Sequence, residues 1–70
     1  MPLALAPMGK GVLIFKVIVE DKIKRHLANL GILPGEIITP MSESEGDLII
    51  KVRGSRLAIN KGLAIKILVK

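Results

Sequence analysis

Few side chains in this sequence are suited to catalysis. His26 is the only histidine, and it lies in a stretch with helical spacing. A Ser-His-Asp site would need that histidine beside a serine and a carboxylate in a pocket. The serines Ser42, Ser44 and Ser55 all fall in predicted turns or loops, where serine is common. The residues therefore favour a surface histidine and a protein that is not an enzyme.

Metal ligands are also scarce. Glu43, Glu45 and Asp47 form an acidic group, but they lack the spacing and the terminal Glu of an EF-hand loop. Without cysteine there is neither a disulfide nor a thiolate site, and one histidine cannot complete a tetrahedral site without several carboxylates. Gly9-Lys10-Gly11 lacks P-loop spacing and precedes a predicted strand, so it is interpreted as a turn. The sequence predicts no catalytic residue, no metal site and no cofactor.

The cations are the remaining side chains with functional potential. The chain has 11 Lys plus Arg against 6 Asp plus Glu, a net charge of +5, and no acid follows Asp47. Such a balance favours anionic partners. Single-strand nucleic acid readers stack bases on aromatic side chains, whereas Phe15 is the only aromatic here and is predicted to be buried. A protein partner is therefore favoured over nucleic acid.

The composition predicts one small domain, residues 1–70, with an aliphatic core. Half of the residues are hydrophobic, which offsets the limited burial that a domain of this size achieves. The apolar stretch Val12–Val19 is interrupted by Lys16 and is much shorter than the ~20 residues of a spanning helix. No signal peptide is recognised. We expect a cytoplasmic protein without membrane insertion.

One helix is predicted over Glu20–Leu30, because Ile23, Leu27 and Leu30 recur at helical spacing. Asp21 is the expected cap residue. Gly31 follows the last leucine, where a left-handed residue commonly ends a helix. Pro34-Gly35 then suits the central positions of a type II turn.

Alternating apolar residues predict five strands around that helix. They are Val12–Val19, Glu36–Met41, Leu48–Val52, Arg56–Ile59 and Ala64–Val69, with a polar loop over Ser42–Asp47 and a helical turn over Asn60–Leu63. Pro2–Met8 is expected to be an extended arm, with Leu3 and Leu5 on one side. Pro40 cannot donate to a ladder, so it is expected at an edge or an end. The pattern predicts a mainly β fold, a small antiparallel five-stranded barrel with one short helix after the first strand.

The strand alternation also predicts which residues face inward. The inward set is Leu13, Phe15, Val17, Val19, Leu48, Ile50, Val52, Leu57, Ile59, Ile65, Ile67 and Val69. The outward apolar set is Ile38, Ile49, Ala58 and Leu68. Outward aliphatic residues ringed by cations suit a protein interface. The predicted partner-binding residues are Ile49, Lys51, Arg53, Lys66, Leu68 and Lys70.

Two motifs carry a resemblance to a known family. The segment Arg25–Gly35 reads RxLxxLGxxPG, with structural positions Leu27, Leu30, Gly31, Pro34 and Gly35. Gly46-Asp47 matches a Gly-Asp pair in the family's hairpin loop, although Leu48 follows directly where the family often has proline. In a chain of this length, the motifs resemble the FeoA family, ferrous iron transport protein A.

The resemblance implies an SH3-like barrel without catalysis of its own. It also implies a role in regulating ferrous iron uptake by binding the cytosolic part of the FeoB permease, with recruitment to the inner face of the membrane. Weak self-association is compatible with this prediction. Two alternatives stay open: a small basic barrel that binds nucleic acid, and a detached metal-sensing domain, because diphtheria-toxin-type metalloregulators carry a similar C-terminal domain.

Overall fold

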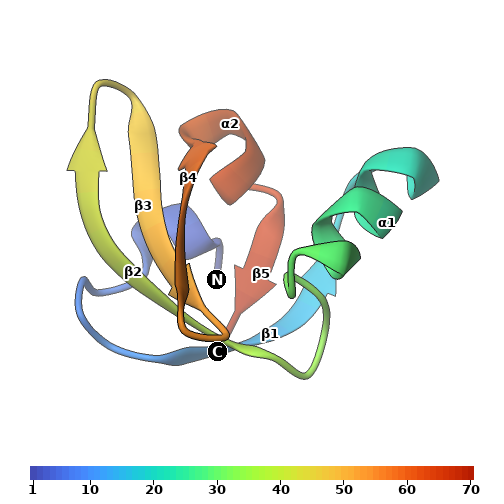
Figure 1. Ribbon diagram of the computed structural model, residues 1–70, viewed down its shortest axis with the longest axis horizontal. Helices are drawn as coiled ribbons and strands as arrows, with labels where there is room; N and C mark the ends of the chain where they lie inside the picture. Colours follow the sequence, from blue (N-terminus) through green and yellow to red (C-terminus); the bar gives the residue numbers. More distant parts are fainter.

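Five antiparallel strands form a single curled sheet in the order β4-β3-β2-β1-β5 (Figure 1). The computed structural model describes residues Met1–Lys70. The elements, in chain order, are η1 (Leu3–Leu5), β1 (Val12–Val17), α1 (Asp21–Asn29), β2 (Ile37–Ser44), β3 (Asp47–Val52), β4 (Ser55–Asn60), α2 (Lys61–Ala64) and β5 (Ile67–Val69). The predicted antiparallel five-stranded architecture, with α1 between the first two strands, is confirmed.

The strand β2 explains why the sheet curls. Its first two residues pair with β1, with Ile38 opposite Val12, whereas the residues from Thr39 onward pair with β3. One strand therefore belongs to both halves of the barrel. A bulge between Pro40 and Ser42 adds to the bend.

The end of α1 forms as the sequence predicts. Gly31 has a φ of +95°, its N–H donates to the Ala28 carbonyl at 3.0 Å, and the Ile32 N–H donates to the Leu27 carbonyl at 2.9 Å. This pair of bonds is the Schellman motif, and Ile32 folds back on the helix as its apolar contact, 1% exposed. The helix start differs from expectation, because the N-cap is Glu20 and its side chain makes no capping bond.

The Pro34-Gly35 turn is also confirmed. The Glu36 N–H donates to the Leu33 carbonyl at 3.2 Å, and Gly35 has a φ of +97°. The Gly35 N–H donates to the Ile14 carbonyl at 2.8 Å, which ties the turn to β1. The turn therefore fixes the point at which the chain enters β2.

The two tight hairpins use turns with two left-handed residues. Glu45 and Gly46 have φ values of 50° and 85°, and Arg53 and Gly54 have values of 52° and 79°. Turns of this kind match the twist of the flanking strands. The predicted loop over Ser42–Asp47 is wrong in extent, because β2 and β3 continue to a Ser44–Asp47 pair and leave only two turn residues.

The predicted inward face of β1 is wrong before the bulge and correct after it. Ile14 is buried, whereas Phe15 is 44% exposed and Leu13 is only half-buried; Val17 is buried as predicted. The cause is a bulge in β1, where Ile14 pairs with Val69 but Lys16 pairs with Leu68. An extra residue in one strand moves the following side chains to the other face.

One position in β2 differs from expectation, because Ile38 is fully buried rather than outward. Pro40 is also buried, and it lies beyond the two residues that pair with β1, on a stretch of β2 paired only with β3, which agrees with the expected edge position. A proline at a bulge is tolerated because the ladder is interrupted there. The Pro40 carbonyl still accepts a hydrogen bond from the Gly9 N–H at 2.6 Å.

The two ends of the chain are less extended than predicted. Ile65 is 56% exposed because α2 continues to Ala64 and delays β5 until Ile67. The N-terminal segment forms the short helix η1, so Leu3 is fully buried while Leu5 is 73% exposed. The predicted helical turn at Asn60 is confirmed, and its side-chain oxygen accepts from the Leu63 N–H at 2.8 Å.

The core is aliphatic throughout. Its buried residues are Leu3, Ala6, Val12, Ile14, Val17, Leu27, Ile32, Ile38, Leu48, Ile50, Val52, Ile59, Ala64, Ile67 and Val69. No polar or charged residue is buried. No helix has the length and apolar character needed to cross a membrane.

Candidate functional site

The six predicted partner-binding residues lie in separate parts of the fold. Ile49 and Lys51 are on the outer face of β3, opposite Ala58 and Arg56 of β4. Lys66 lies between α2 and β5. Leu68 and Lys70 are in or next to β5, which is at the opposite end of the strand order from β4. Ile49 and Lys51 therefore lie next to β4, and they are separated in the sheet from Leu68 and Lys70.

Arg53 is held by an ion pair that the sequence did not predict. Its guanidinium contacts the Glu36 carboxylate through two nitrogens, and the Nε–Oε1 distance is 2.9 Å. The Arg53 side chain also passes over Gly31, where an added Cβ would lie 3.0 Å from Arg53 Cδ. The charge of Arg53 is thus partly engaged with its own chain, and its side chain covers the end of α1.

Lys70 has a partner of its own on the outer face of β1. Its Nζ lies 5.5 Å from the centroid of the Phe15 ring, within the range of a cation–π contact. The Lys70 backbone pairs with Leu13 through two hydrogen bonds of 2.9 Å. The C-terminal end of the chain is therefore fastened to β1.

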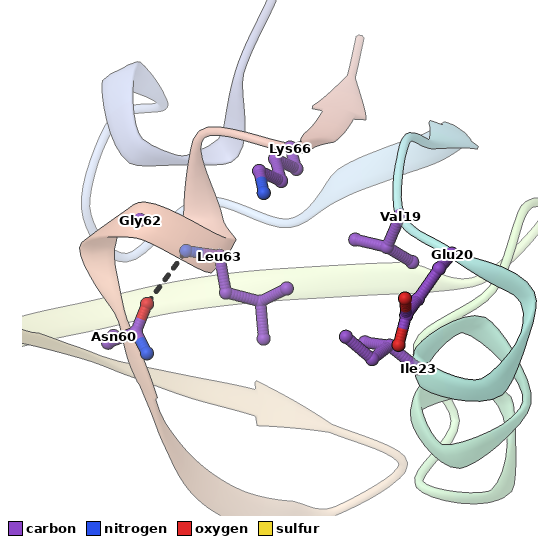
Figure 2. Close-up of a pocket in the computed structure, with 7 residues that line it drawn as sticks. All are labelled: Val19, Glu20, Ile23, Asn60, Gly62, Leu63 and Lys66. Carbon is purple, nitrogen blue, oxygen red and sulfur yellow. Dashed lines mark hydrogen bonds between the residues drawn. The ribbon is translucent and has the colours of Figure 1, made fainter.

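A groove lies between the start of α1 and the α2 region, and Figure 2 shows the residues that line it. Leu63 points into the groove from α2, while Val19 and Ile23 point toward it from the opposite side. Its volume is about 660 Å³, and it is open to solvent. The full lining is Val19, Glu20, Ile23, Asn60, Gly62, Leu63 and Lys66. Of the predicted residues, only Lys66 belongs to it.

The apolar face of α1 is incompletely covered. Leu27 is buried at 3% exposure, but Ile23 and Leu30 on the same stripe are 40% and 39% exposed. A helix in a globular protein normally buries such a stripe against the core. The uncovered part of this helix adjoins the groove at Ile23.

The exposed side chains of the site are mainly aliphatic and cationic. No three His, Cys, Asp or Glu side chains gather in a group that could hold a metal ion. His26 is exposed on α1. Aliphatic side chains next to lysines and arginines instead offer apolar contact together with charge.

Comparison with known proteins decides the family. The family model described as the FeoA domain matches residues 1–70, the whole chain. The chain belongs to the FeoA family. A curated relative from Methanocaldococcus jannaschii, named as a candidate Fe(2+) transport protein A, is 35% identical over 69 residues, which cover 99% of this chain and 84% of the relative.

Solved FeoA structures share the fold. A crystal structure of a FeoA described as an iron uptake regulatory protein is 33% identical, has a TM-score of 0.87, and is matched over 100% of this chain and 93% of its own. A Stenotrophomonas maltophilia FeoA complexed with zinc, described as an SH3 domain protein, is 22% identical with a TM-score of 0.79 over 100% and 89%. The SH3-like fold of this chain is thereby confirmed.

We expect this FeoA-family chain to bind transition metals weakly at most. Ferrous and zinc sites in proteins gather several nitrogen, sulfur or carboxylate ligands, and no such group is present. Calorimetric titration with Fe²⁺ under anaerobic conditions, and with Zn²⁺, should give no saturable high-affinity heat. Submicromolar binding that disappears in His26→Ala would contradict this prediction.

Proposed function

We propose that this chain is a non-enzymatic accessory protein that binds the cytosolic region of the FeoB ferrous iron permease and regulates iron uptake through it. The observation that carries the proposal is the FeoA-family match over the whole chain. The geometry supports it, because the molecule offers an open groove with aliphatic side chains and a lysine in its lining. The protein would act in the cytoplasm, at the inner face of the membrane that holds the permease.

The proposal is tested by direct binding. The purified chain is titrated with the cytosolic region of the FeoB permease from the same genome, in about 0.15 M salt, where long-range charge effects are largely screened. We expect saturable binding that weakens only modestly as salt rises, because apolar contact supplies part of the affinity. In cells, deletion of the gene should reduce Fe²⁺ uptake, and the wild-type copy should restore it.

Nucleic-acid binding is the second candidate, and one observation favours it. Phe15 is 44% exposed rather than buried, so one aromatic ring lies beside Lys70 on the surface. A single ring offers one stacking position, whereas single-strand binders usually combine several with a charged groove. Tight RNA or DNA binding at 0.15 M salt, lost in Phe15→Ala and without binding to FeoB, would replace the adaptor proposal with this one.

A further inference from the structure

The outer edge of β4 has no partner strand. β4 is the last strand of the sheet and pairs only with β3. The pair Val52–Ser55 lies next to the two-residue turn and is a hydrogen-bonded pair. Because such pairs alternate with non-hydrogen-bonded ones, the backbone N–H and C=O groups of Arg56 and Ala58 point away from β3. Neither residue makes a backbone hydrogen bond to a loop, and both are exposed. The edge therefore has free donors and acceptors at regular strand spacing.

The edge also lacks the usual protection. Exposed edges are commonly blunted by proline, by a bulge or by a covering segment. β4 contains no proline, and its register with β3 is regular over six pairs. Arg56 is the only charged residue in the strand. An edge with regular register, without proline or a bulge and with Arg56 as its one charge, can accept another strand.

The groove lies where this edge ends. Asn60 is the last residue of β4 and also lines the groove, together with Leu63 and Ile23. A strand added along β4 would therefore bring its end to a groove that contains the aliphatic side chains of Val19, Ile23 and Leu63. The incompletely covered stripe of α1 forms the opposite wall at Ile23.

We propose that an extended segment of the protein partner adds to β4 as a sixth strand and inserts an aliphatic side chain into the groove lined by Val19, Ile23 and Leu63. This is the mode in which backbone hydrogen bonds supply affinity and a side-chain pocket supplies specificity. The inference rests on the proposed function, because the partner segment is sought in the cytosolic region of FeoB.

Charge defines the chemistry of the segment further. Arg56 on β4 and Lys66 in the groove form no ion pair within the chain, whereas Lys61 is engaged with Glu43 at 2.6 Å. Glu20 is the only acidic residue in the groove. The matching segment is aliphatic with at least one acidic residue. A second copy of this chain fits less well, because each copy carries a net charge of +5.

The first experiment blocks the edge. Ala58→Pro removes one outward N–H and places a ring against an incoming strand, but leaves the pairing with β3 in place. Ala58→Ser keeps the N–H and is the matched control. We expect Ala58→Pro to weaken binding of the FeoB cytosolic region by about tenfold or more and Ala58→Ser to leave it within about twofold. Circular dichroism melting first establishes that both variants fold.

The second experiment addresses the groove. Ile23→Asp places a charge in its apolar wall and should weaken binding of the same FeoB region by about tenfold or more, because burying an unpaired carboxylate is costly. Ile37→Asp is the matched control. Ile37 is also exposed, at 56%, but it lies on β2 outside the groove. The Ile37→Asp variant should bind the FeoB region with the same affinity as the unmodified chain.

The third experiment needs no variant. Backbone amide exchange of the unmodified chain is followed by NMR with and without the FeoB region. Strand addition should slow exchange of the Arg56 and Ala58 amides by about tenfold or more, because they become hydrogen bonded. Contact through side chains alone would leave these two amides unprotected.

The outcomes separate the two levels of the proposal. Binding to FeoB with unprotected β4 amides, or binding lost in Ile49→Asp but not in Ala58→Pro, would overturn strand addition and leave the proposed function standing. If the Arg56 and Ala58 amides become protected from exchange when the chain alone is concentrated, the strand added to β4 comes from a second copy of this chain, and the proposal of a FeoB segment is overturned. No binding to FeoB at all would overturn both.

Discussion

Replacing Gly31 with valine is expected to lower the melting temperature by roughly 10 °C or more, since each kcal/mol shifts Tm by roughly 4–8 °C in a domain of this size. Gly31 has a φ of +95°, where a side chain meets left-handed strain of about 1–2 kcal/mol. The added Cβ would also lie 3.0 Å from Arg53 Cδ and 3.3 Å from Val52 Cγ2. Accommodating it requires Arg53 to move, which disturbs its pair with Glu36.

Gly35→Val is the matched control for this variant. Gly35 has a nearly identical φ of +97°, but nothing lies within 4 Å of an added Cβ. Both variants carry the backbone strain, and only Gly31→Val carries the crowding. Thermal melts should therefore rank Gly31→Val clearly below Gly35→Val. Equal losses of melting temperature in the two variants would show that Arg53 moves aside at no cost. An unchanged melting temperature for Gly31→Val would contradict the helix cap itself.

Ile14→Ala is expected to destabilise the protein by about 2–5 kcal/mol, the usual cost of truncating a buried aliphatic side chain. Ile14 is fully buried in the core. Total stabilities of small domains are about 5–15 kcal/mol, so the variant should be much closer to unfolding. Urea denaturation measures the loss of unfolding free energy, with the dependence of that free energy on urea concentration held equal for the two proteins.

Phe15→Ala provides the comparison that tests the register of β1. Phe15 is 44% exposed, and its cation–π contact with Lys70 contributes about 0.5–1 kcal/mol at an exposed site. We expect its loss of stability to be well below that of Ile14→Ala. The reverse order would mean that β1 pairs without the bulge and buries the ring, as the alternation of its residues alone suggests.

Features set by local chemistry could be predicted from the sequence. The end of α1 and the turn after it depend on Gly31, Pro34 and Gly35, whose φ preferences act within a few residues. The Asn60 cap forms for the same reason, since its side chain bonds a backbone group three residues later. The family resemblance rests on the segment Arg25–Gly35 and on Gly46-Asp47, so it is carried by the sequence alone.

The side-chain directions in the strands depended on pairing between distant segments. Alternating apolar residues show that a strand has two faces, but they do not show where a bulge moves the following side chains to the other face. The bulge at Phe15 is defined by the pairing of β1 with β5, which lies more than fifty residues away. Ile38 is buried because the curl of the sheet turns its face of β2 toward the core. Neither fact is contained in the local sequence.

The candidate site was decided by the tertiary structure in the same way. The groove brings Val19 and Ile23 beside Leu63 and Lys66, and of these only Lys66 is among the partner-binding residues that the sequence predicts. The cations Arg53 and Lys70 looked available, but the fold pairs one with Glu36 and places the other over Phe15. Local propensities determine the helix end and the turns. The exposed edge of β4 exists because the tertiary pairing places β4 last in the strand order, and the groove exists because the fold brings the start of α1 near α2.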